Sequence, residues 1–425
     1  MASSEGSQLR RDYVWNAAAS LAASVFVVLT TAVVSHVIDI QAVGIYALAI
    51  ANGQLFQTLG MYEVRTYHVT DVRRRFSFGT YLAARIVTVV LMIAAIVVHA
   101  LVTGNSASAA ILMILIASVR VFDAFEDVFY SEFQRAGRLD LGGRACFVRT
   151  MATMIVFCLM VVLTGHLLVS TVTTLVASLV VMVLAYVPPA RSLYSLRPSW
   201  DARAVLQLLA ECLPLFLASF LNMFIFTAPR WAIDTSMGEA AEVAQGYFTV
   251  IFMPASAINL LSLLVFRPLL TPMATRWAAG DDEGFLTAIR RGLVTTFLAS
   301  LVVAAAAYVA GPPVLDLVYS TDVSGLRLEL MVLIAGGALN AGGVILYYAL
   351  STMRLQRLVL VGYVVGAVAA GVLCRILVPP LGLLGAATAF TGSMAVLALC
   401  FAAGIVVSHA TARDRDPRAT TSHEH

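Results

Sequence analysis

The stretch AAILMILIASVRVFDAFED, which runs from Ala109 to Asp127, decides the fold of this chain. It opens on apolar residues and then carries Arg120, Asp123, Glu126 and Asp127 along the same run. A membrane-spanning helix needs about 20 mostly apolar residues, and charged side chains that face lipid are costly. The stretch therefore predicts a membrane helix whose charges face protein or water instead of lipid.

The whole chain has the composition of a polytopic membrane protein. Hydrophobic residues make up 60% of its 425 residues and charged residues 12%, whereas about 25% of the residues of a soluble domain are charged. The mean hydropathy is +0.90. Apolar windows of spanning length lie at 14–38, 42–61, 81–102, 107–131, 145–164, 167–188, 213–234, 244–266, 293–311, 328–350, 358–378 and 383–408. They predict an all-α protein with about twelve transmembrane helices.

Arginine supplies all 27 basic residues, and its distribution predicts the orientation of the helices. Twenty-one arginines fall in the N-terminus, the tail and alternate loops, whereas Arg230, Arg327 and Arg375 fall on the opposite side. The remaining three, Arg85, Arg120 and Arg149, lie inside predicted spans and are not counted. Cytoplasmic loops carry the excess of positive charge. We therefore expect a multi-pass protein with both termini in the cytoplasm.

Two short matches indicate an internal repeat. Asp39 ends the first predicted span and is followed by Gly44, while Asp234 ends the seventh and is followed by Gly246. Transporters are commonly built from such repeats, with the substrate site between them. We expect two pseudo-symmetric six-helix lobes around a central cavity. The N-lobe is predicted at 1–200, the C-lobe at 201–410 with an interfacial amphipathic helix at 201–212, and a disordered cytoplasmic tail at 411–425.

The charges of the span at 107–131 lie mostly on one face. Arg120, Asp123 and Asp127 fall within about 60° of one another on a helix, and the spacing allows an Arg120–Asp123 ion pair. This face is either an internal salt-bridge cluster or the wall of a polar cavity or coupling-ion site. Glu126 lies to one side, where we expect it to contact water. Arg120→Ala is expected to leave Asp123 unpaired and to lower both folding yield and activity.

A second pair of charges lies near the outer end of the seventh predicted span. Arg230 and Asp234 are four residues apart and share a face, and Pro229 is expected to kink the helix there. Arg230 either extends to the outer interface beside Trp231 or faces the central cavity and binds an anionic group. The sequence leaves both interpretations open.

Polar residues also mark the first spans. Asn16 begins a polar stripe along the first helix and Gln57 lies in the second, which fits either helix packing or a hydrated lobe interior. Arg85 lies about one turn inside the third span, where it either reaches the cytoplasmic headgroups or lines an inner vestibule. We expect His68, in the loop before it, to be a surface histidine.

Motifs for catalysis are absent from the sequence. It contains no P-loop, HExxH or GxSxG pattern, and the predicted outer loops are short. The five cysteines show no metal-ligand spacing and are interpreted as packing residues. We therefore expect neither an enzyme nor a cofactor or metal site.

Four stretches resemble the polysaccharide-transport (Wzx-type) flippases of the multidrug/oligosaccharidyl-lipid/polysaccharide exporter superfamily. They are YEVRTYHVTDVRRRFSFGTYLAARI (62–86), FQRAGRLDLGGR (133–144), PLFLASFLNMFIFTAPRWAID (214–234) and FMPASAINLLSLLVFRPLL (252–270). The resemblance covers about the first 280 residues, and beyond them it lies mainly in hydropathy. It implies two six-helix bundles arranged as a V around a central cavity.

The same resemblance implies a function. Such proteins move a polyprenyl-diphosphate-linked oligosaccharide, the repeat unit of a cell-surface polysaccharide, from the inner to the outer leaflet of the bacterial cytoplasmic membrane. The implied partners are this lipid-linked oligosaccharide, membrane lipid, polysaccharide-assembly proteins and a coupling ion, Na⁺ or H⁺, and no nucleic acid. Matching the motifs carries a set of cavity cations over to Arg65, Arg85, Arg144, Arg230 and Arg267, with Asp234 beside Arg230.

Two other classes of function compete with this one. A drug or metabolite antiporter of the same superfamily would favour cavity carboxylates for a cationic substrate. In this chain Arg230 is the main charged residue in the outer half of the expected cavity. A membrane-bound glycan polymerase or ligase would need a larger outer loop than this chain offers. The sequence does not identify the glycan, the coupling ion or the oligomeric state.

Overall fold

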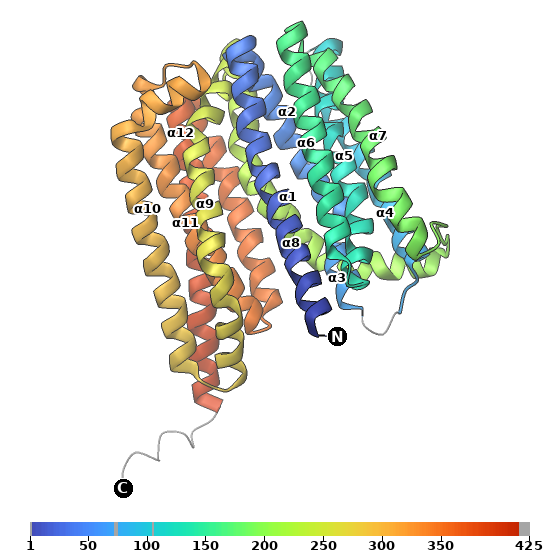
Figure 1. Ribbon diagram of the computed structural model, residues 1–425. Helices are drawn as coiled ribbons and strands as arrows, with labels where there is room; N and C mark the ends of the chain where they lie inside the picture. Colours follow the sequence, from blue (N-terminus) through green and yellow to red (C-terminus); the bar gives the residue numbers. More distant parts are fainter. Residues whose placement is uncertain (1, 72–74, 104–105, 416–425) are drawn as a thin grey trace. The chain divides into compact units, whose positions relative to one another are not determined.

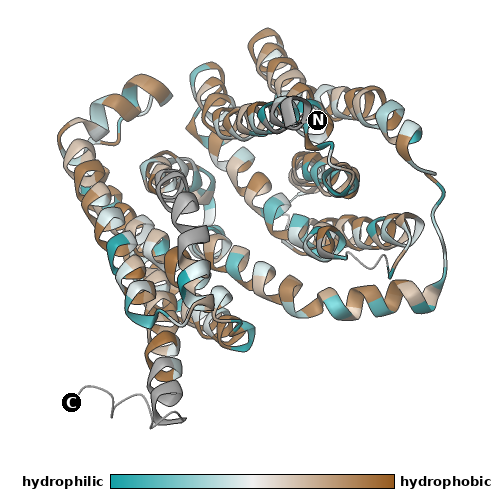
Figure 2. Cartoon of the chain, turned by 60° about the horizontal axis from the view of Figure 1, so that its bottom comes forward, coloured by the Kyte–Doolittle hydropathy of each residue, from teal (hydrophilic) through white to brown (hydrophobic). Residues whose placement is uncertain are grey.

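The computed structural model describes the backbone of residues 2–71, 75–103 and 106–415. The side chains of 2–6, 9, 70, 259–272 and 409–415 lie outside that description. Helices joined by short connections make up the described residues, as the twelve apolar windows predict, because a helix satisfies its own backbone hydrogen bonds inside a membrane. Within the described residues, nine helices are long and apolar enough to cross one. Figure 2 shows hydrophobic residues dominating the helices.

The first seven helices run in the order shown in Figure 1. They are α1 (Ala2–Val37), α2 (Ile40–Met61), α3 (Val64–Thr70), α4 (Phe78–Thr103), α5 (Ala107–Arg135), α6 (Leu139–Thr164) and α7 (Leu167–Leu193). Side-chain caps fix two of the starts. Asp39 accepts a hydrogen bond from the Ala42 N–H at the start of α2, and Ser106 accepts one from the Ala109 N–H at the start of α5.

The second half continues the pattern. Its elements are α8 (Ala202–Ser236), the short 3₁₀ turn η1 (Gly238–Ala240), α9 (Ala241–Ala278), α10 (Asp282–Tyr319), the turn η2 (Ser324–Leu326), α11 (Arg327–Thr352) and α12 (Gln356–Arg415). α12 is two helices joined at Gly382, whose φ of 55° is incompatible with a right-handed α-helix. With α12 counted as two and the short α3 left out, the helices correspond one for one to the twelve predicted spans.

Two details differ from the predicted boundaries. The segment 201–212 is continuous with the span that follows it, since α8 runs from Ala202 to Ser236 without a break, and its interfacial position stays a prediction. α12 continues to Arg415, within the predicted tail, and the prediction of disorder for 416–425 lies outside the described residues.

The chain divides into two compact units. Unit 1 contains 1–223, 239–249 and 317–321, and unit 2 contains 224–238, 250–316 and 322–425. In unit 1, α1 packs on α6, α6 packs on α7, and both α2 and α4 pack on α5. Tyr46 of α2 stacks on Phe157 of α6 with ring centroids 5.1 Å apart. These packings place α5 against helices on several sides, which positions its charged face inside unit 1.

The two glycines of the sequence repeat meet inside unit 1. A Cβ atom on Gly44 of α2 would collide with the carbonyl oxygen of Glu242, and one on Gly246 of α9 would collide with the carbonyl oxygen of Ile40. Each collision involves the residue four positions before the other glycine. The two helices therefore cross in a symmetrical way at glycine, which allows their backbones to approach closely.

Gly44→Ala and Gly246→Ala are each expected to destabilise this crossing by about 1 to 3 kcal/mol, because the added methyl group overpacks a backbone contact. Gly371→Ala is the matched control, since a Cβ there has nothing within 4 Å. Thermal unfolding of the purified protein in detergent measures the effect. Equal midpoints for all three variants would contradict the close crossing.

Candidate functional site

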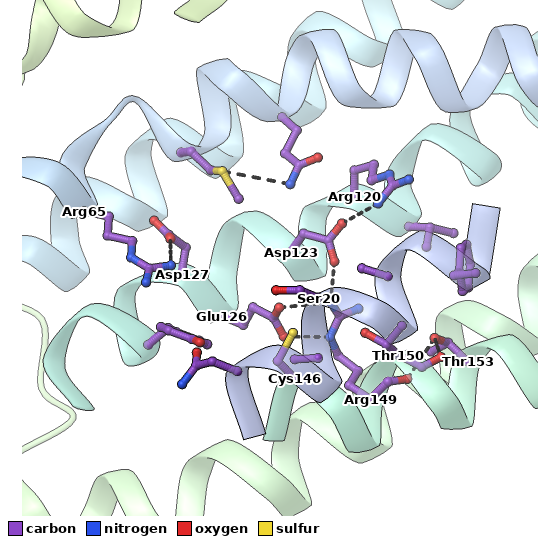
Figure 3. A pocket seen from close by; sticks show the side chains of 18 residues that line it. Ser20, Arg65, Arg120, Asp123, Glu126, Asp127, Cys146, Arg149, Thr150 and Thr153 are labelled. Atoms are coloured by element: carbon purple, nitrogen blue, oxygen red, sulfur yellow. Dashed lines mark hydrogen bonds and ion pairs between the residues drawn. The ribbon is translucent and has the colours of Figure 1, made fainter. Parts of the chain in front are cut away.

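A polar cavity of about 330 Å³ lies within unit 1. Side chains of α1, α2, α3, α5 and α6 line it, and Figure 3 shows them from close by. Its polar lining consists of Asn16, Ser20, Gln57, Arg65, Arg120, Asp123, Glu126, Asp127, Tyr130, Cys146, Arg149, Thr150 and Thr153. The volume is at the lower end of the range of small-molecule sites, which suits one chemical group of a larger ligand.

Arg149 of α6 organises the first charge cluster. Its Nε and Nη2 atoms bind the two Glu126 carboxylate oxygens at 2.7 and 3.1 Å, and Nη2 also contacts the Asp123 carboxylate. Arg120 binds the other Asp123 oxygen at 2.9 Å, and the Tyr186 hydroxyl of α7 donates to Glu126 at 2.7 Å. Figure 3 shows Asp123 between the two guanidinium groups. Two cations thus balance two carboxylates between α5 and α6, and the Tyr186 hydroxyl adds a hydrogen bond from α7.

Asp127 organises the second cluster. Arg85 of α4 is fully buried, pairs with Asp127 at 2.7 Å and donates to the Gly60 carbonyl oxygen. Arg65 of α3 approaches the other Asp127 oxygen at 3.6 Å. It also donates to the Gln134 side-chain oxygen at 3.0 Å and lies over the Tyr130 ring, 4.3 Å from its centroid. Asp127 is therefore shared between a close arginine and a more distant one.

The charges of the two clusters do not cancel completely. Four arginines (Arg65, Arg85, Arg120 and Arg149) meet three carboxylates (Asp123, Glu126 and Asp127), which leaves one positive charge. The other cations are held at 2.7 to 2.9 Å by a carboxylate, whereas the Arg65 side chain is 39% exposed and lies 3.6 Å from its carboxylate. The excess positive charge therefore belongs mainly to Arg65.

The structure confirms part of the predicted α5 face and corrects the rest. The Arg120–Asp123 ion pair is present. Glu126 does not lie in water, because it is 7% exposed and bound by Arg149. The expectation that Arg120→Ala leaves Asp123 unpaired is also wrong, since Arg149 contacts the same carboxylate. Arg85 neither reaches the headgroups nor lines the cavity. Its side chain is fully buried, and its guanidinium group is paired with Asp127.

The remaining predicted site residues fall into three groups. Asn16 and Gln57 line the unit 1 cavity, while Arg144 is exposed and is not among the residues that line it. Arg230 and Asp234 lie in unit 2 and are partly buried. The side chain of Arg267 lies outside the described residues. A role for these last residues in a central cavity stays a prediction.

Arg149 and Tyr186 are the site residues that the sequence analysis missed. Arg149 is the only charged residue in the apolar run at 145–164, and no local pattern assigns it a role. One available signal was charge balance. The span at 107–131 carries three carboxylates and one arginine, so it requires cations from neighbouring spans, and Arg85 and Arg149 are the arginines that lie about one turn inside those spans.

His68 belongs to a third cluster and is not a surface histidine. It is 0% exposed, stacks on Tyr81 with ring centroids 3.8 Å apart and bonds Glu132 at 2.7 Å. The Tyr81 hydroxyl donates in turn to Asp71 at 3.0 Å. Burial lowers the pKa of His68 below its ordinary value, and the hydrogen bond to Glu132 offsets this only in part. The folded protein therefore favours the neutral imidazole.

Arg149→Met is expected to cost about 3 to 5 kcal/mol, because it leaves a buried carboxylate without its cation. Arg120→Met should cost less, since Asp123 keeps its contact with Arg149. Protein accumulation in the membrane and the unfolding midpoint in detergent measure both variants. Adding Glu126→Met to Arg149→Met should restore part of the loss. Equal effects of the two arginine variants would show that Arg149 does not organise the cluster.

Acidification is expected to destabilise the protein through His68. An unfolded histidine binds a proton below about pH 6.5, whereas folded His68 resists protonation because its pKa is lowered. The contribution of His68 to the stability of the folded protein is therefore fully present above that pH, and it decreases as the pH drops below it. The unfolding midpoint should decrease as the pH is lowered from about 7.5 to about 5.5, and this decrease should be smaller in His68→Gln. An identical pH dependence in both proteins would argue against this role.

Comparisons with known proteins agree on the fold. Neither a protein-family model nor a curated protein matches the sequence. An inward-facing structure of a multidrug resistance MATE family transporter of the MOP superfamily is 15% identical, covers 93% of this chain and 95% of its own, and gives a TM-score of 0.65. The lipid II flippase MurJ, in an inward closed conformation, is 12% identical, with coverages of 93% and 87% and a TM-score of 0.71.

A third solved structure is a MOP superfamily transporter from Pyrococcus furiosus, for which a reversed polarity of the binding pocket suggests a different function. It is 14% identical, covers 95% of this chain and 96% of its own, and gives a TM-score of 0.56. The similarity thus extends well beyond residue 280, where the sequence resemblance lies mainly in hydropathy. This chain is a polytopic all-α membrane protein with the fold of the MOP superfamily transporters.

Proposed function

We propose that this protein flips a polyprenyl-diphosphate-linked oligosaccharide from the inner to the outer leaflet of the bacterial cytoplasmic membrane by alternating access. Structures with this fold include a lipid flippase and multidrug transporters, so the fold alone supports either class of cargo. The cavity of unit 1 supports the lipid-linked cargo over a cationic drug. Its excess positive charge on Arg65 carries the proposal for an anionic headgroup.

The physical problem of the reaction is desolvation. A sugar–diphosphate headgroup loses its hydration if it enters hydrocarbon unaided, which is costly for its hydroxyl groups and much more so for its charges. The cavity of unit 1 offers amide, hydroxyl and guanidinium groups that replace part of that hydration. The polyprenyl chain needs no such site, since it remains in the lipid.

Arg65 suits the diphosphate better than the other arginines. Its guanidinium group is the most exposed of the four, and its long contact with Asp127 competes with the closer pair of Asp127 and Arg85. A phosphate group can therefore replace Asp127 as the partner of Arg65 without leaving a buried carboxylate unpaired. Arginine binds phosphate through two parallel hydrogen bonds, and a single free cation keeps the grip weak enough for release.

A cationic drug fits this cavity less well. Asp123, Glu126 and Asp127 are each already paired with an arginine at close range. A drug cation would have to displace a guanidinium group from a buried carboxylate and leave that group unpaired. The antiporter is thus the second candidate.

The proposal for a flippase has three further parts. They are a coupling ion, Na⁺ or H⁺, contacts with polysaccharide-assembly proteins, and a cytoplasmic position for both termini.

The first test is a strain that lacks the protein. Its lipids are extracted, polyprenyl-linked intermediates are identified by mass, and the leaflet that holds them is determined. We expect a lipid-linked oligosaccharide to accumulate on the cytoplasmic side while the surface glycan disappears. Intermediates that reach the outer leaflet normally would refute the proposal. Unpolymerised repeat units there would indicate an enzyme, and an intact glycan would indicate a small-molecule exporter.

Arg65→Gln is expected to lower the rate of headgroup transfer in proteoliposomes by about tenfold or more, because a hydrogen bond to a charged group is lost. Arg191→Gln is the matched control, since Arg191 is an exposed arginine near the end of α7 that does not line the cavity. Equal rates for Arg65→Gln and the control would remove the observation on which the proposed function depends.

A further inference from the structure

The connection between α2 and α3 is strained. Tyr62 and Glu63 both adopt left-handed backbone conformations, with φ values of 49° and 53°. Residues with a side chain rarely adopt this region, and two in succession are rarer, because Cβ crowds the following carbonyl oxygen. Neither residue is glycine, asparagine or aspartate. Contacts elsewhere must hold such a conformation, and the structure shows which they are.

Both strained residues are held by α8. The Tyr62 ring stacks on Phe216, with centroids 4.3 Å apart and an interplanar angle of 12°. The Ser219 hydroxyl donates to Glu63 Oε1 at 2.6 Å. Phe216 and Ser219 are three residues apart on α8, so they lie on one face. The other Glu63 oxygen accepts a hydrogen bond from Thr66, a residue of α3 itself.

The strained connection determines where Arg65 lies. Val64, between Glu63 and Arg65, is 1% exposed and packs in the core of unit 1. A buried Val64 on one side and the α8 contacts on the other fix the first turn of α3, from which Arg65 reaches the cavity. The same helix α8 continues from unit 1 into unit 2 after Met223. A movement of α8 is therefore transmitted directly to the base of Arg65.

We propose that Tyr62, Glu63 and Ser219 are positioning residues that make the charge of the cavity depend on α8. While Ser219 and Phe216 hold the connection, Arg65 is presented to the cavity. When α8 releases it, the backbone relaxes and Arg65 withdraws. The meaning of this device for transport rests on the proposed function, because only an anionic headgroup needs Arg65. The positional dependence itself does not rest on it.

Cys146 can report the cavity charge, because this residue is partly exposed and lines the same cavity. The purified full-length protein is treated with an anionic and a cationic methanethiosulfonate reagent, and the modification rate of Cys146 is followed by mass spectrometry. The ratio of the anionic to the cationic rate reports the local potential. Arg65→Gln should lower this ratio by about threefold, since one positive charge is removed.

Ser219→Ala should lower the ratio by a similar factor, although it changes no charge. Thr66→Ala removes a hydroxyl group from the same carboxylate but leaves the link to α8, so it should keep the ratio of the unmodified protein. Ser219→Thr restores a donor and should rescue it. Phe216→Leu removes the ring that stacks on Tyr62 and also changes no charge, so it repeats the test at the other α8 contact if Ser219→Ala accumulates poorly.

The inference fails if Arg65→Gln lowers the ratio while Ser219→Ala and Phe216→Leu leave it unchanged. It also fails if Thr66→Ala lowers the ratio as much as Ser219→Ala, or if no variant lowers it. Headgroup transfer is measured separately. If Arg65→Gln lowers the ratio but transfers headgroups normally, the proposed function fails, whatever Ser219→Ala does to the charge of the cavity.

Discussion

The structure of unit 1 depends on the neutralisation of the charges that α5 carries into a membrane span. Charged groups at this depth are costly unless they are paired, and hydrophobic burial drives little association between helices in lipid. Arg85 of α4 and Arg149 of α6 supply the missing cations, and Tyr186 of α7 adds a hydrogen bond to Glu126. The ion pairs therefore fix which faces of α4, α5 and α6 meet, because a rotation of one of these helices would leave a buried charge alone. The Tyr186 hydrogen bond adds α7 to this arrangement.

This neutralisation also shapes the chemistry of the cavity. Its carboxylates accept the tightest contacts from arginine, so they offer little to a cationic ligand. The one cation held at longer range is Arg65, which has an aromatic ring, an amide oxygen and a shared carboxylate as neighbours. The arginines that stabilise the fold and the arginine available to a ligand are thus different residues. Composition and charge counts alone do not separate the two roles.

Local patterns in the sequence predict the helices and one ion pair, but not the pairs that cross between helices. The apolar windows locate the spans because a membrane-spanning helix needs about 20 consecutive apolar residues. The Arg120–Asp123 pair follows from a three-residue spacing on one helix. Glu126 and Arg85 were misplaced because each depends on the rotation of a neighbouring helix, which an apolar sequence does not specify. His68 was misplaced because the loop predicted there is the helix α3, which packs its side chain against Tyr81 and Glu132. Charge balance was the one available guide, since three carboxylates in one span require cations from others.

The strained connection before α3 sets the position of Arg65, although Arg65 is the most exposed of the four arginines. Arg85 and Arg149 are fixed by buried carboxylates, and moving either would expose an unpaired charge at a cost of several kcal/mol. Arg65 has no such penalty, because Asp127 keeps Arg85 when Arg65 leaves. Its position must then be set by the backbone, and Tyr62 and Glu63 store of order 1 to 3 kcal/mol each in doing so. Strain of this size is comparable to the contacts of Phe216 and Ser219 that oppose it. A small movement of α8 is therefore sufficient to change the charge that the cavity presents.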